Sequence, residues 1–349
     1  MPVTVNEVAN IKLFHMANIR LNCYIPCILS CLAYINENLI GSFLWKFSFN
    51  YKYMIKKGKN CKEGIIGVDI QSFEKESEEF LQLFCIKTIR TRITEHFIDK
   101  IKCCVDENIP IIMTLDQYYD INSTLYLKER NSFHYIVIIG YNDIDNTITY
   151  YDYRITGAPE KRTIDYISLE KGVESYLTAD HSATNFKYYI SDASDNIFKQ
   201  EFLYSSENCR RVVSKMIKFY SYESENYRCL QDYTSLLEKQ IKYNSCSTEY
   251  FEDLFNTFSL DIIAFKGIDE FIIKSIENDV LPELYQQYNI ISQKYKAIYN
   301  TILKAKYSSN IRDFVKVQEL FQKILQLERG LYKTYILTMQ GNENTLHLV

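Results

Sequence analysis

Apolar residues in the second half of the chain recur three or four positions apart, the spacing of amphipathic helices. Two such sets flank a break at 308–310, one at Leu284, Tyr288, Ile291, Tyr295, Ile298 and Ile302, the other at Val317, Leu320, Ile324, Leu327 and Leu331. They predict two long helices that pack as an antiparallel pair. Further helices are predicted at about 208–222 and 227–243, so we expect the chain after about residue 200 to be mainly helical.

The first half alternates between helical and strand patterns. Helices are predicted at about 23–37, 72–83 and 95–107, and the apolar run 108–115 predicts a buried strand that ends at Asp116. Two runs rich in β-branched and aromatic residues follow at 134–141 and 147–153. The Asn/Asp-rich segment 142–146 between them favours a turn, so the two runs are predicted to form an antiparallel hairpin.

The register of this hairpin decides where two polar side chains lie. If Ile136 pairs with Asp152, then His134 and Asp152 are diagonal neighbours on one face of the sheet. A shift of one residue would place them on opposite faces.

Composition sets limits on the function. The chain has 349 residues, 47% of them hydrophobic, which is enough for a substantial core. A formal charge of −4 argues against nucleic acid as a partner. We find no secretory signal and no apolar run long enough to span a membrane, and we expect a cytoplasmic protein with free thiols at its ten cysteines.

Cys23, His134 and Asp152 follow one another in the chain order of a papain-like nucleophile site. Pro26 is tolerated only in the first turn of a helix, so the helix start and its positive dipole end should face the Cys23 sulfur. His134 would act as the base and Asp152 would fix its tautomer. The candidates for oxyanion or substrate contacts are Asn18, Asn22 and Asp116, and the sequence does not choose between the two asparagines.

Simpler interpretations compete with this site. A cysteine in an apolar helix is most often a core residue, and we interpret Cys27 and Cys31 as packing residues. Three thiols spaced over two helical turns do not converge on one ion, so no metal site is predicted. Asp116 is more simply a solvated carboxylate at a strand end. A basic cluster is formed by lysines 52, 56, 57 and 59. We interpret it as an ordinary solvated face and not as a docking site for an acidic protein.

Three segments together resemble a known family. They are 110–119, the block Phe133-His134-Tyr135-Ile136-Val137-Ile138-Ile139-Gly140-Tyr141-Asn142, and 148–152. They look like the amino-terminal domain of the butirosin biosynthesis protein H family, a branch of the C39-like, papain-fold cysteine peptidases. The stretch from Asn22 to Tyr34 resembles the nucleophile helix of that family. Papain-like enzymes commonly carry Gln six residues before the nucleophile, whereas this chain has Ala17 there.

The resemblance covers about residues 15–175 and implies an α+β, papain-like cysteine protease fold with a nucleophile helix and an antiparallel sheet. The change in periodicity near residue 200 divides the chain into this catalytic domain at 1–200 and a helical domain at 201–349. The resemblance implies Cys23, His134 and Asp152 as nucleophile, base and orienting acid. It also implies an acyltransferase of natural-product biosynthesis, similar in kind to the amide-forming enzyme of the closthioamide pathway. No bound cofactor is expected; the acyl donor would be the phosphopantetheine arm of a carrier protein and the acceptor a small amine. The alternatives are a cysteine peptidase with the same triad and a non-catalytic scaffold.

Overall fold

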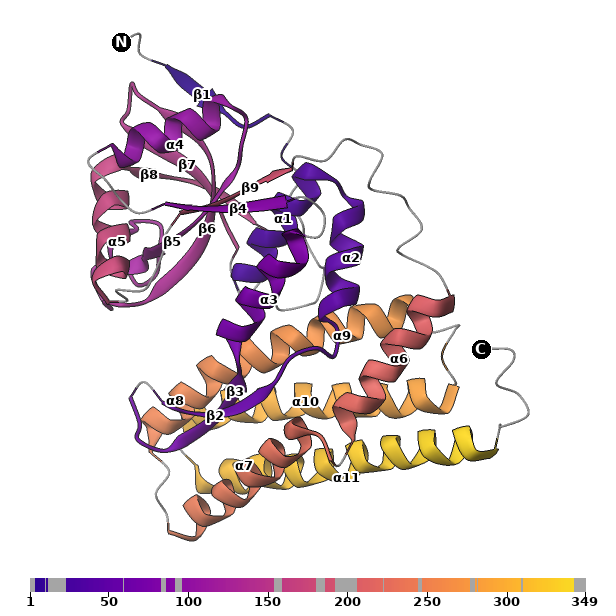
Figure 1. The fold of residues 1–349 in the computed structure, drawn as a ribbon. Helices are drawn as coiled ribbons and strands as arrows, with labels where there is room; N and C mark the ends of the chain where they lie inside the picture. Colours follow the sequence, from indigo (N-terminus) through magenta and orange to yellow (C-terminus); the bar gives the residue numbers. More distant parts are fainter. Residues whose placement is uncertain are drawn as a thin grey trace. The chain divides into compact units, whose positions relative to one another are not determined.

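The computed structural model describes residues 4–9, 11, 23–58, 60–82, 86–91, 96–153, 159–179, 186–191, 206–221, 223–243, 247–276, 280, 282–308 and 310–341. These residues form two compact units (Figure 1). The first takes its described residues from the segments up to Ile40 and from Lys75 to Ser191, and the second takes those from Gly41 to Glu74 and from Ser206 onward.

The first unit is built on one antiparallel sheet. Its strands are β1 (Val5–Glu7), β4 (Ile86–Thr91), β5 (Ile111–Asp116), β6 (Phe133–Asn142), β7 (Thr147–Asp152), β8 (Glu160–Asp165) and β9 (Phe186–Ser191). Their order is β4-β9-β5-β6-β7-β8, and β1 pairs with the far end of β6. The helices of the unit include α1 (Tyr24–Ile35), α4 (Phe97–Asp106), α5 (Tyr166–Ala179) and the part of α3 (Ile70–Gln82) from Lys75 onward, with a short turn η1 (Gln117–Tyr119).

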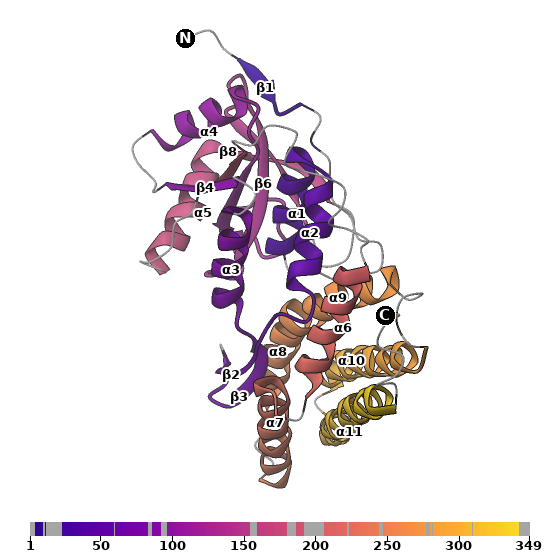
Figure 2. The ribbon, with the colours of Figure 1, turned by 45° about the vertical axis from the view of Figure 1, so that its right-hand side comes forward.

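Helices cover both sides of this sheet. Figures 1 and 2 show α1 on one side of β6 and α5 on the other. Every residue of β5 is buried, as its mainly apolar sequence predicts, and α1 is buried from Tyr24 to Ala33. The layers position the site because they bring the start of α1 to β6.

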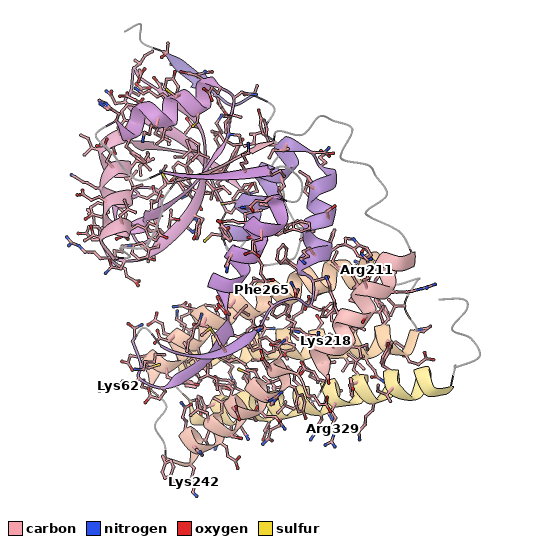
Figure 3. The ribbon with its side chains drawn as sticks, in the orientation of Figure 1. Lys62, Arg211, Lys218, Lys242, Phe265 and Arg329 are labelled. Atoms are coloured by element: carbon pink, nitrogen blue, oxygen red, sulfur yellow. The ribbon has the colours of Figure 1, made fainter. Side chains whose placement is uncertain are left out.

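The second unit is mainly helical. It contains α6 (Ser206–Tyr220), α7 (Glu225–Lys242), α8 (Thr248–Thr257), the π-helical turn η4 (Phe258–Ile262), α9 (Ile263–Ser275), α10 (Pro282–Ser308) and α11 (Ile311–Gly341). It also holds the hairpin of β2 (Tyr53–Lys57) and β3 (Gly64–Val68). Phe265 is fully buried within it, whereas Lys242 and Arg329 extend outward (Figure 3).

The two longest helices pack as the antiparallel pair that their sequence predicts. Gln287 Nε2 donates to Thr334 Oγ1, Tyr295 Oη to Glu328, and Lys304 pairs with Asp313. Partner positions rise along α10 while they fall along α11. Such contacts require helices that run in opposite directions.

The assignment of residues 41–74 differs from the predicted domain division, which placed them in the catalytic domain. The end of α2 (Asn38–Phe47), the hairpin and the start of α3 (Ile70–Gln82) group instead with the helical unit. The backbone N–H of Tyr53 donates to Asn226 Oδ1 at 2.7 Å, and Asn226 Nδ2 donates to the Tyr51 carbonyl at 3.0 Å. Both tyrosines are buried there. The segment therefore completes the helical core.

A buried charge cluster lies inside this core. Lys266, Asp269 and Glu328 are 3%, 0% and 2% exposed. The Lys266 ammonium lies 3.8 Å from Asp269 Oδ2 and 4.5 Å from the centre of the Phe219 ring, while Glu328 accepts from Tyr295 Oη at 2.9 Å. Burial lowers the pKa of Lys266 and raises those of Asp269 and Glu328, to about 6 and about 7. One cation thus faces two carboxylates.

Candidate active site

Cys23 immediately precedes the first residue of α1. Its backbone has φ −62° and ψ −24°, and Pro26 occupies the first turn, where its missing N–H costs no helical hydrogen bond. The free N–H groups and the positive dipole end of α1 are therefore near the sulfur, as the position of Pro26 predicts. Such a position favours the thiolate form of a cysteine.

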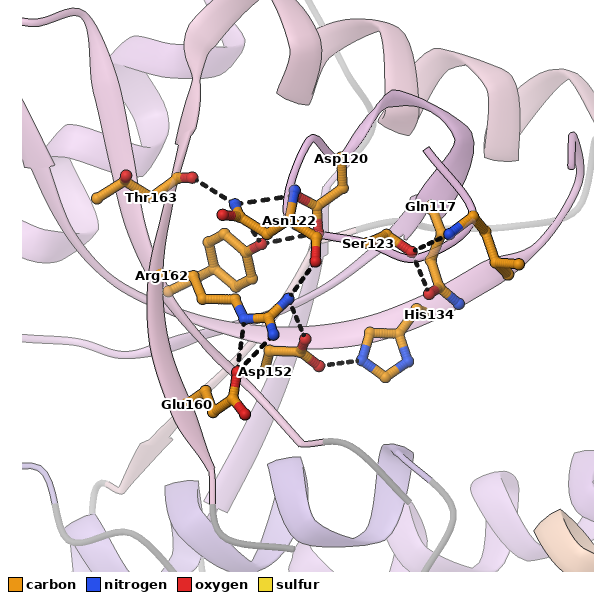
Figure 4. Close-up of polar contacts among 11 residues, drawn as sticks. Gln117, Asp120, Asn122, Ser123, His134, Asp152, Glu160, Arg162 and Thr163 are labelled. Atoms are coloured by element: carbon orange, nitrogen blue, oxygen red, sulfur yellow. Dashed lines mark hydrogen bonds and ion pairs between the residues drawn. The ribbon is translucent and has the colours of Figure 1, made fainter. Parts of the chain in front are cut away.

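His134 and Asp152 meet on neighbouring strands. In the β6–β7 pairing Ile136 is opposite Asp152, the register on which the sequence-based hypothesis depended, and that register is confirmed. The imidazole Nε2 lies 2.7 Å from Asp152 Oδ1 (Figure 4). Since Nε2 faces the carboxylate, Nδ1 is the ring nitrogen left for the thiol.

The Cys23 and His134 side chains are hydrogen-bonded and change each other's ionisation. Burial opposes ionisation of the thiol, but the charge of His134, its hydrogen bond and a backbone hydrogen bond from Tyr135 lower the pKa of Cys23 below its ordinary value of 9.0. Burial likewise opposes the charged imidazole, but Cys23 and Asp152 raise the pKa of His134 to about 10. The pair thus favours thiolate and imidazolium at neutral pH.

This coupling makes a direct prediction for the imidazole. We expect the His134 ring to titrate near pH 10 instead of its ordinary value of 6.5. In Cys23→Ala the midpoint should fall, because the thiolate that favours the protonated ring is gone. Ring resonances of histidine-labelled protein, followed by NMR against pH, measure both midpoints. An unchanged midpoint in the variant would contradict the thiolate–imidazolium pair.

Asp116 does not lie with His134. Leu115 is opposite His134 in the β5–β6 register, so the next side chain along β5 points to the other face. Its carboxylate is fully buried and accepts from the Asn131 and Ser132 N–H groups and from Ser175 Oγ on α5. The alternative of a solvated carboxylate is therefore wrong: Asp116 holds the loop before β6 to the sheet and to α5.

The other predicted positions have different outcomes. Asn18 and Asn22 lie outside the described residues, so their oxyanion role stays a prediction. Cys27 and Cys31 are 0% and 1% exposed and burial raises both of their pKa values, which confirms them as packing residues. Among the described residues no group of three or more His, Cys, Asp or Glu side chains could hold a metal ion.

The basic cluster is only partly described, because Lys59 lies outside the described residues. Lys52 pairs with Glu225 at 3.2 Å, and Lys56 pairs with Asp261 at 2.5 Å. Both acidic partners belong to the helical unit. These contacts hold the hairpin segment to its own unit and give no evidence for a docking surface.

Arg162 is a member of the site that sequence reasoning missed. Its Nη1 lies 3.0 Å from Asp152 Oδ2 and donates to the Asn122 carbonyl at 2.8 Å, and the guanidinium also binds Glu160 (Figure 4). The alternation of Glu160 and Arg162 was the available signal, since residues two apart on a strand share a face. The register that places them beside Asp152 is fixed only in the folded sheet.

A comparison with family models finds one match. Residues 45–184 match the Peptidase C39 like family, a span that includes His134, Asp152 and Arg162 but begins after Cys23. The match supports a C39-like, cysteine-peptidase-like fold for this part of the chain. No curated protein matches the chain. No helix among the described residues combines the length and the apolar character that a membrane span needs.

Proposed function

We propose that the protein is a cysteine-dependent acyltransferase that forms an amide through an acyl-Cys23 intermediate. The observation that carries the proposal is the continuous contact from Cys23 to His134 to Asp152. A thiolate held by an imidazolium at a helix start is the arrangement that covalent acyl chemistry requires. The resemblance to the butirosin biosynthesis protein H family favours transfer to an amine over hydrolysis.

Each of the three residues has its own role in the two steps of the reaction. The Cys23 thiolate attacks the carbonyl carbon of a carrier-protein thioester, the carbon–sulfur bond to the phosphopantetheine arm breaks, and the leaving thiol takes the proton of His134. An amine then attacks the acyl-Cys23 carbonyl and gives a proton to His134, and the Cys23 thiolate leaves. Asp152 keeps the imidazole oriented through both steps. The acyl group passes from sulfur to nitrogen with no net oxidation.

A cysteine peptidase is the second candidate function, and the match to the Peptidase C39 like family favours it. The same thiolate would attack the carbonyl carbon of a peptide bond, the imidazolium would give its proton to the leaving amine, and water would replace the amine acceptor in the second step. The two candidates differ only in the donor and in the group that releases the acyl-enzyme.

Intact mass spectrometry separates these functions. We expect incubation with an acyl thioester of N-acetylcysteamine, or with the same acyl group on a phosphopantetheinyl carrier protein, to add one acyl group to wild type and none to Cys23→Ala. Addition of primary amines should then release the amide. Cys103→Ala is the matched control, because Cys103 is exposed on α4 of the same unit and should not affect the adduct.

The other outcomes each exclude a candidate. Release of free acid only, together with cleavage of peptides, would replace transfer with hydrolysis. If wild type forms no adduct and cleaves no peptide, neither enzymatic function holds and the fold is a non-catalytic scaffold.

A further inference from the structure

Arg162 and His134 bind different oxygens of the Asp152 carboxylate. The carboxylate divides its two oxygens, with Oδ1 at 2.7 Å from the imidazole Nε2 and Oδ2 at 3.0 Å from the guanidinium Nη1. The side chains of Arg162 and Asp152 are only 10% and 8% exposed. Water therefore screens this contact less than it screens a surface ion pair.

Sheet register and one loop hold the guanidinium in place. In the β7–β8 pairing Asp152 is opposite Glu160, so Arg162, two residues along β8, is its diagonal neighbour on the same face. On the other side the Asn122 carbonyl accepts from Nη1, and Asn122 Nδ2 donates to the Thr163 carbonyl at 2.7 Å. The position of Arg162 is thus set by β8 and by the segment before β6 together.

We propose that Arg162 is a positioning residue of the active site, which fixes Asp152 against His134 and balances the carboxylate charge whenever the imidazole is neutral. This inference rests on the proposed function only for its effect on turnover. Its physical basis is that a buried carboxylate without a cation costs free energy. With Arg162 present, His134 can release its proton without leaving Asp152 in that state.

Several other titratable groups lie around the same pair. Cys23 and Cys27 approach from α1, and Glu160 binds the outer side of the guanidinium. Asp120 accepts a hydrogen bond from Tyr150 on β7, the strand between β6 and β8. All of them except Arg162 are neutral or negative, so each ionised one favours the protonated imidazole. Arg162 is the cation that offsets them, and its removal should make His134 hold its proton more strongly.

NMR titration of the His134 ring tests this without any substrate. In Arg162→Gln we expect the midpoint to move upward by about one pH unit, because one neighbouring positive charge is lost. Arg162→Lys should return it toward wild type, since an ammonium can still reach Asp152. Glu160→Gln is the matched control: it removes a negative charge from the outer side of the guanidinium and leaves the Asp152 contact intact, so the midpoint should not move upward.

A second comparison separates positioning from a purely structural role. In the Asp152→Asn background Arg162→Gln should move the His134 midpoint by much less than one pH unit, because the carboxylate that Arg162 positions is gone and only its direct charge effect on the ring remains. This double variant removes both charges, so a folding failure of Arg162→Gln alone does not remove the test. A midpoint that stays in place or moves downward in Arg162→Gln would overturn the proposal. An Arg162→Gln shift that is equally large in the wild-type and Asp152→Asn backgrounds would also overturn it.

Turnover distinguishes this inference from the proposed function. If acyl transfer occurs, Arg162→Gln should lower kcat by about tenfold with little change in KM, since the residue does not contact substrate. If the NMR shifts appear but no thioester reacts, the function is wrong and the role of Arg162 stands. If transfer occurs and the midpoint does not move, the proposed function stands and the positioning role of Arg162 is wrong.

Discussion

Alkylation of Cys23 by iodoacetamide at about pH 6 should slow by about a hundredfold or more when His134 is replaced by alanine. In wild type the charge and hydrogen bond of His134 lower the pKa of the thiol in spite of its burial. Without the imidazole, burial alone would raise that pKa. Only the thiolate is alkylated, so the rate at low pH measures its population.

The experiment has an internal reference. Cys103 is exposed on α4, and its alkylation in the same sample should be unaffected by the substitution. Peptide mass spectrometry after timed alkylation gives both rates at each pH. Equal Cys23 rates in wild type and His134→Ala across the pH range would remove the basis of the site. Where a turnover assay exists, acyl transfer should fall by about a thousandfold or more, the usual loss for a general base and its ion pair.

Lys266→Met should destabilise the helical unit by about 3–5 kcal/mol. Methionine keeps most of the apolar stem against the surrounding rings, so the loss reports the charge and not a cavity. Asp269 and Glu328 would then lose the buried cation that they share, although Tyr51, Tyr295 and the Phe49 N–H still donate to them and the charge of Lys215 still acts on Asp269. Urea unfolding followed by far-ultraviolet circular dichroism measures the change.

The control is a variant in which the buried cluster carries no charge. Lys266→Met/Asp269→Asn/Glu328→Gln has no buried charge and should recover most of the lost stability. Glu328→Gln alone leaves one cation with one anion. The gain in the free energy of unfolding over wild type should grow between about pH 4.5, the ordinary pKa of Glu, and about pH 7, the pKa of Glu328 in the folded protein. Above about pH 7 the gain should stay constant. A charge-free variant as unstable as Lys266→Met would show that packing, not charge, dominates.

Sequence patterns predicted much of the fold because they depend on local periodicity. The Asn/Asp turn and the two apolar runs around it were enough to predict the hairpin but left its register open. A bulge between Ile138 and Gly140 shifts the pairing by one residue and so brings Asp152 opposite Ile136, on the face of His134. Proline chemistry likewise placed Cys23 at a helix start. Each of these inferences uses residues that are neighbours in the chain or across one tight turn.

What the sequence could not predict depends on contacts between distant segments. The strands that carry Asp152 and Arg162 are separated by residues 153–159, and a connection of that length leaves the strand register open. Asp116 was misjudged because nothing in its local sequence reveals that Ser175 and two backbone N–H groups bind it. Tyr51 and Tyr53 fit any apolar core, so their place in the helical unit could not be inferred.

The division of the chain makes the two units topologically inseparable. The polypeptide enters the helical unit at Gly41, returns to the sheet unit at Lys75 and leaves it again before α6, so each unit is discontinuous in sequence. A truncation near residue 200 would keep the β2–β3 hairpin but remove the helices that bury Tyr51 and Tyr53. The fragment would expose a cluster of aromatic side chains in the middle of its sequence and tend to self-associate. The sheet unit, which carries the candidate site, and the helical unit are therefore expected to fold as one chain.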